Sequence, residues 1–330
     1  MEQTTIATRP ESRPPTAAHQ RGAPAHALIL AGGEGLRALP VTRALFGDDR
    51  PKQFCALVGR EPLLVQAQRR ASLVVPPSRT MLVLTRRHEP YYRGLVYGIP
   101  ASSLVIQPSN RGTAAAVLYG LLRIARRTPS APVVILPSDH WVSDEAVFMA
   151  HAAAAIGIVR AHSTAIVLLG VAPTRPEREY GWIEPSAPIE EVWSDLHGVA
   201  RFVEKPDPAR ALDLQQSGTS YWNTSVVAGQ AEALLFLFAM AQPGMVDAFL
   251  QVWPKLGTPA EAEAMERLYE SIPASDFSRD ILAPQPGSLS VLGVTGVTWE
   301  DIGNPERLLA AQRRAPRRAY RPPSTSSAAS

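Results

Sequence analysis

Cysteine and lysine are both scarce in this chain of 330 residues. The single cysteine, Cys55, excludes an intramolecular disulfide and a zinc site built from several thiolates, and it favours a reducing compartment. Only three of the 33 basic residues are lysines, namely Lys52, Lys205 and Lys255. A position that keeps lysine in such a chain is a candidate for a role that arginine cannot fill.

Long apolar runs are absent as well. The first fifteen residues lack the apolar stretch of a secretory signal, and no later run is long enough to span a bilayer. We therefore expect a cytoplasmic protein that does not bind membranes. Hydrophobic residues make up 45% of the chain and charged residues 19%, which indicates a large buried core and excludes a mostly disordered protein.

The net charge of +3 is concentrated at one end of the chain. Five arginines and no acidic residue lie between Arg313 and Ser330, so the remainder of the chain is slightly acidic. A folded part without excess positive charge provides no electrostatic basis for specific nucleic-acid binding. We expect small-molecule partners, and the sequence leaves a homodimer open.

The two ends of the chain differ from its middle. Residues 1–25 and 315–330 are rich in Pro, Ala, Arg and hydroxyl residues without apolar periodicity, which predicts two disordered tails, the second one basic. The segment 26–314 is expected to form one domain. Its first half, about 26–175, contains short β-branched or apolar runs separated by helical segments, at His26–Ala31, Thr80–Thr85, Leu104–Ile106, Val133–Leu136 and Ala165–Val171.

This alternation predicts an α/β, Rossmann-like fold with a mainly parallel sheet and helices on both faces. The second half, about 176–314, changes to a pattern that predicts a smaller lobe on the same continuous fold. Its expected strands lie near Tyr180–Glu184, Val199–Glu204 and Trp222–Val227, and its helices lie around Gln230–Met240 and Pro259–Ser271.

One helix can be predicted in more detail. Apolar residues recur at a spacing of three or four along Thr113–Arg126, which indicates a helix whose apolar stripe faces the sheet. Ser109 or Asn110 stands where an N-cap residue is expected.

The first predicted strand runs directly into the segment Gly32-Gly33-Glu34-Gly35-Leu36-Arg37. Glycines at such a place let backbone N–H groups approach a phosphate. An ordinary glycine turn is the alternative, and Gly33, Gly35 and Ala38 also match the GxGxxA of a dinucleotide-binding fold. We do not favour that fold, because Pro40 follows where its helix should open and no acidic residue ends the second strand.

Two lysines and two aspartates stand at the ends of predicted strands or in adjoining loops. Lys52 and Lys205 each adjoin a proline, and a compact ammonium group there suits contact with a phosphate. Asp139 follows the strand Val133–Leu136, and with Asp301 it could supply the oxygen ligands that Mg²⁺ prefers. The alternatives are solvated lysines, turn or cap aspartates and, for the adjacent His140, a packed imidazole.

Together these segments resemble the sugar-1-phosphate nucleotidylyltransferases, most closely the mannose-1-phosphate guanylyltransferase branch. The resemblance begins with Leu30–Arg37 and Pro51–Phe54, which match the signature of the family. Further matches follow in the order of the family, at Arg43, Gln107–Ala114, Pro137–His140, Tyr180–Glu184, Phe202–Pro206, Trp222-Asn223 and Asp301–Gly303. Matches from residue 30 to 303 cover nearly the whole predicted domain.

The resemblance implies the nucleotide-diphospho-sugar transferase fold and an enzyme that transfers a nucleotidyl group from a nucleoside triphosphate to a sugar 1-phosphate, releasing pyrophosphate. GTP and mannose 1-phosphate are the implied pair, with Mg²⁺ as cofactor. The absence of any segment resembling an isomerase domain implies a one-domain transferase.

The resemblance also implies roles for single residues. Arg37 and Lys52 are the implied catalytic residues, the latter stabilising the departing pyrophosphate, and Asp139 and Asp301 are the implied metal ligands. The implied nucleotide-binding residues are Gly32, Gly33, Gly35, Arg43, Gln107, Asn110, Arg111 and Thr113. The implied sugar-phosphate residues are Tyr180, Gly181, Glu204, Lys205 and Asn223, with Gly181 letting the sugar pack against the backbone.

Three departures from the family pattern qualify this expectation. Leu36 replaces the usual threonine, Thr224-Ser225 replaces Ser-Gly, and Ile281 stands where an acid usually follows Asp276 by five residues. Two alternatives follow, a nucleotidylyltransferase for another sugar or base and a non-catalytic sugar-nucleotide sensor. We expect the enzyme, because both lysines and both candidate metal ligands are present.

Overall fold

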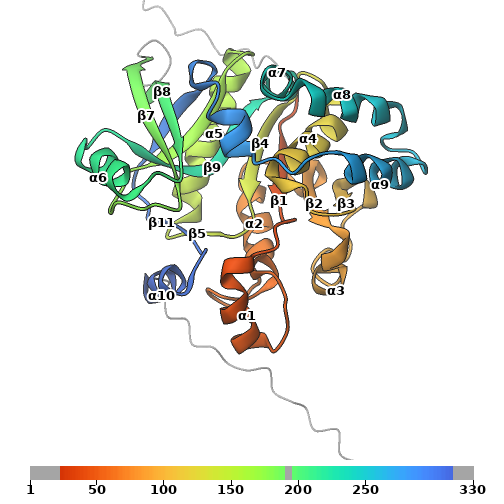
Figure 1. The fold of residues 1–330 in the computed structure, drawn as a ribbon, viewed down its shortest axis with the longest axis horizontal. Coiled ribbons are helices and arrows are strands. Elements are labelled where there is room, and N and C mark those ends of the chain that lie inside the picture. The colour runs from red at the N-terminus through yellow and green to blue at the C-terminus, as the bar shows by residue number, and fades with distance from the viewer. Residues whose placement is uncertain (1–22, 190–194, 315–330) are drawn as a thin grey trace, which may run out of the picture.

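The computed structural model describes residues 23–189 and 195–314 (Figure 1). Of the two predicted tails, only residues 23–25 fall within these ranges. The strands of the described residues are β1 His26–Leu30, β2 Thr80–Thr85, β3 Leu104–Gln107, β4 Pro132–Pro137, β5 His140–Val142, β6 Ile166–Val171, β7 Gly181–Pro188, β8 Leu196–Glu204, β9 Tyr221–Gln230, β10 Ser290–Val294 and β11 Trp299–Asp301.

Helices separate most of these strands. They are α1 Leu39–Phe46, α2 Leu63–Ser72, α3 Glu89–Tyr92, α4 Gly112–Ala125, α5 Glu145–Ala161, α6 Pro208–Gln216, α7 Ala231–Ala241, α8 Pro243–Val252, α9 Glu261–Ser271 and α10 Pro305–Arg314. Across the described ranges, no helix has the length and apolar character needed to cross a membrane.

A mixed sheet joins both halves of the sequence in the order β3-β2-β1-β4-β9-β6-β10-β8-β7. Strands β1, β2, β3 and β4 pair in parallel, as do β6 and β10, whereas β7, β8 and β9 pair antiparallel to their neighbours. Because β9 runs opposite to β4 and β6, its first residues lie at the edge where those two strands end. A separate pair, β5 with β11, stands beyond that edge.

Two layers of apolar side chains pack on opposite faces of the sheet. Successive residues of a strand alternate between them, so Leu28 of β1 faces one layer while Ile29 faces the other. Side chains of α4, α7, α8 and α9 complete the first layer, and those of α2, α5 and α6 complete the second. A third, smaller cluster joins Trp141 to Ile302 and Leu308 and docks α10 near the end of β5 (Figure 1).

The predicted fold class and strand positions are confirmed by these elements, with boundaries that differ by a few residues. The apolar stripe predicted for α4 is wider than expected, because helices cover the side of α4 that faces away from the sheet and almost the whole helix is buried.

Two local predictions are wrong. The N-cap of α4 is Arg111, not Ser109 or Asn110, and the Arg111 side chain makes no capping hydrogen bond, although Oδ1 of Asn110 accepts one from Gly112 N. The carbonyl of Ser275 instead accepts a hydrogen bond from Ala114 N at 3.0 Å, a contact between distant segments. Pro40 does not prevent a helix after the glycine segment, because it occupies the first turn of α1, where a missing N–H costs nothing.

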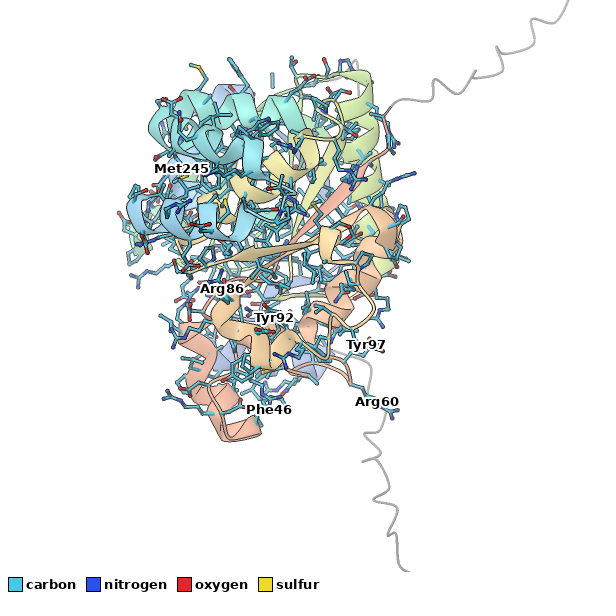
Figure 2. The ribbon with its side chains drawn as sticks, turned by 90° about the vertical axis from the view of Figure 1, so that its right-hand side faces the viewer. Phe46, Arg60, Arg86, Tyr92, Tyr97 and Met245 are labelled. Carbon is cyan, nitrogen blue, oxygen red and sulfur yellow. The ribbon has the colours of Figure 1, made fainter. Side chains whose placement is uncertain are left out.

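An ion pair joins two sides of the molecule near the carboxyl ends of β2 and β3. Arg86, which follows β2 directly and is labelled in Figure 2, pairs with Glu266 of α9. The contact places α9 beside the loop that follows the second strand.

Candidate active site

A cleft of about 580 Å³ opens at the carboxyl ends of β1 and β4. These strands are neighbours, so the segments that follow them meet, and Ser138 donates to the carbonyl of Leu30 from both its backbone N–H and its hydroxyl. The cleft is lined by Glu34, Gly35, Leu36, Arg37, Ala38, Lys52, Asn110, Asp139, His140, Asp276, Asp301 and Gly303. Carboxyl ends of parallel strands are where α/β sheets bind ligands.

The three glycines of the first loop serve different purposes. A Cβ on Gly33 would meet nothing within 4 Å, which leaves its backbone open to a ligand. Gly35 has φ +63°, a left-handed conformation that glycine adopts without strain. Gly32 is needed for packing, because a Cβ there would lie 2.5 Å from Nε2 of Gln107. Gln53, which the sequence prediction missed, donates to the carbonyl of Gly33 at 2.7 Å and holds the loop.

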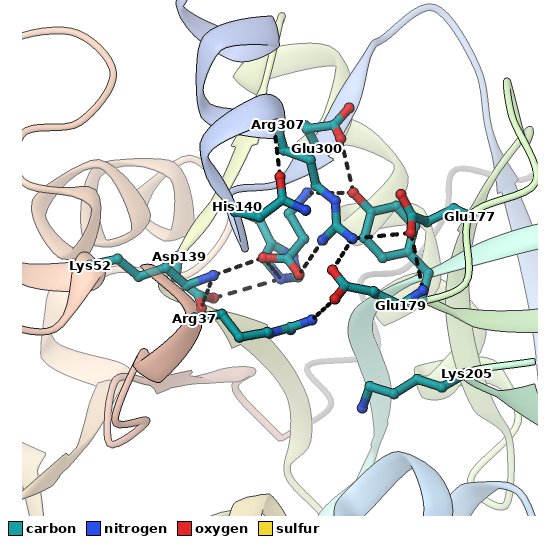
Figure 3. Close-up of polar contacts among 12 residues, drawn as sticks. Arg37, Lys52, Asp139, His140, Glu177, Glu179, Lys205, Glu300 and Arg307 are labelled. Atoms are coloured by element: carbon teal, nitrogen blue, oxygen red, sulfur yellow. Dashed lines mark hydrogen bonds and ion pairs between the residues drawn. The ribbon is translucent and has the colours of Figure 1, made fainter. Parts of the chain in front are cut away.

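Lys52 and Asp139 meet in the cleft (Figure 3), and Asp301 joins them there. The Nζ atom of Lys52 lies 2.9 Å from Oδ2 of Asp139 and 2.8 Å from Oδ1 of Asp301. Asp139 is the second residue after β4, and the pairing of β11 with β5 sets Asp301 opposite His140. The two carboxylates predicted to share a site are therefore adjacent in space, although 162 positions separate them in the sequence.

The charges of this cluster are mutually stabilised. Burial opposes the charged form of Lys52, but Asp139 and Asp301 outweigh it and raise the pKa of the ammonium. Burial would likewise raise the pKa of Asp301, yet Lys52, His140 and Arg307 hold it well below its usual range. Lys52 and Asp301 therefore stay charged together at neutral pH.

The side chain of His140 completes a group of possible metal ligands. Its ring and the carboxylates of Asp139 and Asp301 offer ligand atoms that lie within 4.8 Å of one another. Burial lowers the pKa of His140 despite the nearby carboxylates, so the imidazole is neutral at neutral pH. Two carboxylates suit a hard cation such as Mg²⁺, and the ammonium of Lys52 marks a point between them where positive charge is favoured.

A layer of charged side chains supports Asp301 from behind. Arg307 of α10 reaches Oδ2 of Asp301 at 3.4 Å and lies 4.5 Å from the centre of the Tyr180 ring. The Tyr180 hydroxyl donates to Glu300 at 3.0 Å, and Arg175 binds Glu300 at 2.5 Å. Tyr180 is buried here, is absent from the cleft lining and supports Glu300 through its hydroxyl, and its contact with the sugar phosphate stays a prediction.

Some of the predicted nucleotide-binding residues line the cleft, and others lie outside it. Asn110 lines the cleft, and its Oδ1 accepts from Gly112 N at 2.8 Å. Arg111 donates to the Tyr269 carbonyl at 2.6 Å, and Thr113 donates to Asp276. Thr113 holds the start of α4 against the segment that contains Asp276, whereas Arg111 ties it to α9.

Gln107 and Arg43 lie outside the cleft lining. Gln107 is buried, packs against Gly32 and accepts a hydrogen bond from the Tyr269 hydroxyl at 3.1 Å. Arg43 is an exposed residue of α1 that pairs with Asp49. Among the described residues, no contact brings the Arg43 side chain to the cleft.

The predicted sugar-phosphate residues gather where β7, β8 and β9 begin or end. Glu204 is mostly buried, which raises its pKa, and it pairs with the half-exposed Lys205 at 2.9 Å. In Figure 3 the Lys205 side chain lies on the opposite side of the view from Lys52. A Cβ on Gly181 would lie 2.8 Å from Glu204, so this glycine admits a protein carboxylate as its close neighbour.

Asn223 and Ser225 form one local motif in β9. Ser225 is one of the residues that depart from the family pattern. The pairing of β9 with β6 skips residues between Asn223 and Val227, which creates a bulge. Ser225 lies in this bulge with φ 60°, and its N–H donates to Oδ1 of Asn223 at 3.1 Å. The family pattern has glycine at this position, and glycine adopts this left-handed conformation without strain.

The other two departures from the family pattern, Leu36 and Ile281, lie in different surroundings. Leu36 is 68% exposed at the cleft, an unusual position for leucine. Ile281 is fully buried in the core, and the neighbouring Asp280 accepts from Ser275 Oγ at 2.9 Å and Asp276 N at 2.8 Å. Asp280 therefore stabilises the segment Ser275-Asp276. It lies one position before Ile281, where the family pattern has its acid.

The sequence prediction missed Glu179, Glu300, Arg175 and Arg307. Each binds a partner more than a hundred positions away, and each looks like an ordinary surface charge in the sequence. No local pattern marks such residues, so only the folded chain reveals them.

A glycine loop after the first strand, acids at the carboxyl edge and an antiparallel lobe beyond it define the nucleotide-diphospho-sugar transferase fold. The chain belongs to the nucleotidyl transferase family, whose model matches residues 26–318.

Three relatives illustrate the similarity. The xanthan biosynthesis protein XanB of Xanthomonas campestris pv. campestris (strain B100) is 30% identical over 285 residues, covering 86% of this chain and 58% of that protein. The mannose-1-phosphate guanylyltransferase of Sinorhizobium fredii is 29% identical, covering 84% of this chain and 52% of that protein. A solved structure of mannose-1-phosphate geranyltransferase from Thermus thermophilus superposes with TM-score 0.71 at 30% identity, covering 85% of this chain and 76% of that one.

The chain thus spans between half and three fifths of the length of these two curated relatives. A structure of mannose-6-phosphate isomerase from Helicobacter pylori, 19% identical with TM-score 0.64, shares the fold and covers 84% of this chain and 100% of that one.

Proposed function

We propose that the protein transfers a nucleotidyl group from a nucleoside triphosphate to a sugar 1-phosphate and releases pyrophosphate. GTP and mannose 1-phosphate are the proposed substrates. The observation that supports this most is the meeting of Lys52, Asp139 and Asp301 in the cleft, beside Gly35 of the glycine loop. A buried cation and two acids that line a cleft of about 580 Å³ suit chemistry on a triphosphate.

The reaction needs positioning and charge neutralisation more than covalent help. An oxygen of the sugar phosphate is itself the nucleophile; it forms a bond to the α-phosphorus as the bond to pyrophosphate breaks. The N–H groups of the glycine loop and the guanidinium of Arg37 would bind the triphosphate. Lys52 would stabilise the charge that develops on pyrophosphate, and Lys205 would hold the sugar phosphate from the other lobe.

Mg²⁺ is the proposed cofactor, with Asp139 and Asp301 as its ligands. When bound, it would supply positive charge that offsets the reacting phosphates. The ammonium of Lys52 now lies at 2.8 and 2.9 Å from the same carboxylates, so its side chain shares that site with the ion or moves towards the phosphates.

Pyrophosphate release from the purified protein tests the proposal, with Mg²⁺ and each pairing of four nucleoside triphosphates with several sugar 1-phosphates. We expect GTP with mannose 1-phosphate to react fastest, EDTA to stop the reaction and added Mg²⁺ to restore it. Asp139→Asn and Asp301→Asn should each reduce kcat strongly, and the double variant should be little worse, because the two acids act as a unit.

Two alternatives predict different results in this assay. Faster turnover with UTP or another sugar phosphate would assign the protein to a different substrate pair within the same class. Binding of nucleotide and sugar phosphate without pyrophosphate release from any pair would indicate a sensor, for which the exposed Leu36 at the cleft is the motivating observation.

A further inference from the structure

Two arginines from distant parts of the chain bind one carboxylate at the edge of the cleft. Oε1 of Glu179 accepts from Nη1 of Arg37 at 2.8 Å, and Oε2 accepts from Nη2 of Arg307 (Figure 3). Arg37 belongs to the segment that follows the glycine loop, whereas Arg307 belongs to α10. Glu179 therefore links the loop to the helix.

The two sides of this link differ in rigidity. The Arg307 side chain is only 5% exposed and also contacts Glu177 at 3.1 Å and Asp301 at 3.4 Å. The Arg37 side chain is 51% exposed, and Glu179 is its partner among the described contacts. Arg307 therefore fixes Glu179, and Glu179 in turn restrains a side chain that would otherwise sample many rotamers.

The contact leaves most of the Arg37 guanidinium available. A guanidinium carries five N–H donors, and the ion pair with Glu179 involves Nη1. Nε and Nη2 can still donate to an anion in the cleft, which Arg37 lines. Arg307 offsets part of the negative charge of Glu179, which limits the repulsion between Glu179 and a phosphate.

We infer that Glu179 is a positioning residue that, anchored by Arg307, holds Arg37 in the orientation that binds the triphosphate. The inference rests on the proposed function only in taking a nucleoside triphosphate as a ligand of the cleft. Holding Arg37 in advance reduces the rotamer freedom lost on binding, so the benefit appears as nucleotide affinity.

A double-mutant cycle on nucleotide binding tests the inference without any turnover. Calorimetry would measure the affinity of the tightest-binding of the four common nucleoside triphosphates, with Mg²⁺ and no sugar phosphate. We expect Glu179→Ala to weaken binding by about three- to fivefold, the size typical of a half-exposed pair. In an Arg37→Ala background the same change should have no further effect.

Two companion variants separate positioning from a general effect of charge or stability. Glu179→Gln keeps an oxygen acceptor for Arg37 and should retain part of the affinity. Glu263→Ala removes a glutamate from another exposed Glu–Arg pair, with Arg267 on α9, and should leave affinity unchanged. Melting temperatures of the Glu179 variants should stay close to that of the unmodified protein.

Tighter binding by Glu179→Ala would show that Glu179 competes with the phosphates for Arg37, and the inference would be wrong. An equal loss in the Arg37→Ala background would also overturn it. If the protein binds the nucleotide with the expected coupling but transfers it to no sugar phosphate, the proposed function fails and the inference stands. If the protein binds no nucleoside triphosphate, both the proposed function and the inference about Glu179 are wrong.

Discussion

Replacing Lys52 with methionine should destabilise the protein strongly, because the change leaves two carboxylates facing each other without a cation. Methionine keeps the apolar length of the stem and removes the charge. The Lys52 side chain is 8% exposed and Asp301 is 14% exposed, so water can compensate only partly. Asp139, at 29%, is more open to solvent.

The size of the effect follows from these exposures. Removing one partner of a buried ion pair typically costs about 3–5 kcal/mol, and the partial exposure of Asp139 favours the lower end, about 3 kcal/mol. For a chain of this size each kcal/mol shifts the melting temperature by about 2 °C, so we expect a decrease of about 6 °C for Lys52→Met. Differential scanning calorimetry would measure it.

Three comparisons make the test specific. Lys255→Met, which alters an exposed lysine shortly after α8, should leave the melting temperature nearly unchanged. Adding Asp301→Asn to Lys52→Met should restore part of the stability, because it removes one of the two repelling charges. Millimolar Mg²⁺ should raise the melting temperature of Lys52→Met more than that of the unmodified protein, because a cation replaces the lost ammonium.

An unchanged melting temperature for Lys52→Met would refute this reasoning. It would mean that the two carboxylates are well solvated or far enough apart to tolerate each other. A large decrease without any Mg²⁺ effect would uphold the electrostatic argument and count against Asp139 and Asp301 as metal ligands.

Two further predictions concern the neighbouring segments. The hydrogen bond from Arg279, reinforced by Asp276 N and Ser275, holds the pKa of Asp280 below its usual range; its stabilising effect is therefore present above about pH 4 and is lost as the pH falls further. Urea unfolding of Asp280→Asn should accordingly show a smaller loss of stability between pH 5 and pH 3 than the unmodified protein, and equal losses would contradict the assignment. Ser225→Gly should raise the unfolding free energy by up to about 1 kcal/mol, because it relieves a left-handed serine, and a decrease would show that the hydroxyl is needed in the bulge.

The sequence alone determined the elements of the nucleotide half and many residues of the cleft. Strands such as Thr80–Thr85 can be read from short apolar runs, because burial on both faces of a sheet requires continuous apolar sequence. Gly33, Gly35, Lys52 and Asp139 could be found because each lies in a short segment that follows a strand or a turn, and Asp301 because it ends the short strand β11. The residue types that carry this chemistry stand in short sequence segments, so the sequence is enough to indicate them.

Only the tertiary structure decided which residues meet. Nothing in the sequence sets Glu179 between Arg37 and Arg307, caps α4 with the carbonyl of Ser275 or buries Tyr180 behind Asp301. These contacts depend on the strand order, in which β9 and β10 of the second half are placed beside β4 and β6 of the first. Because ion pairs and backbone caps act over a few ångströms in space and carry no periodic pattern along the chain, they become visible only once the sheet has brought distant segments together.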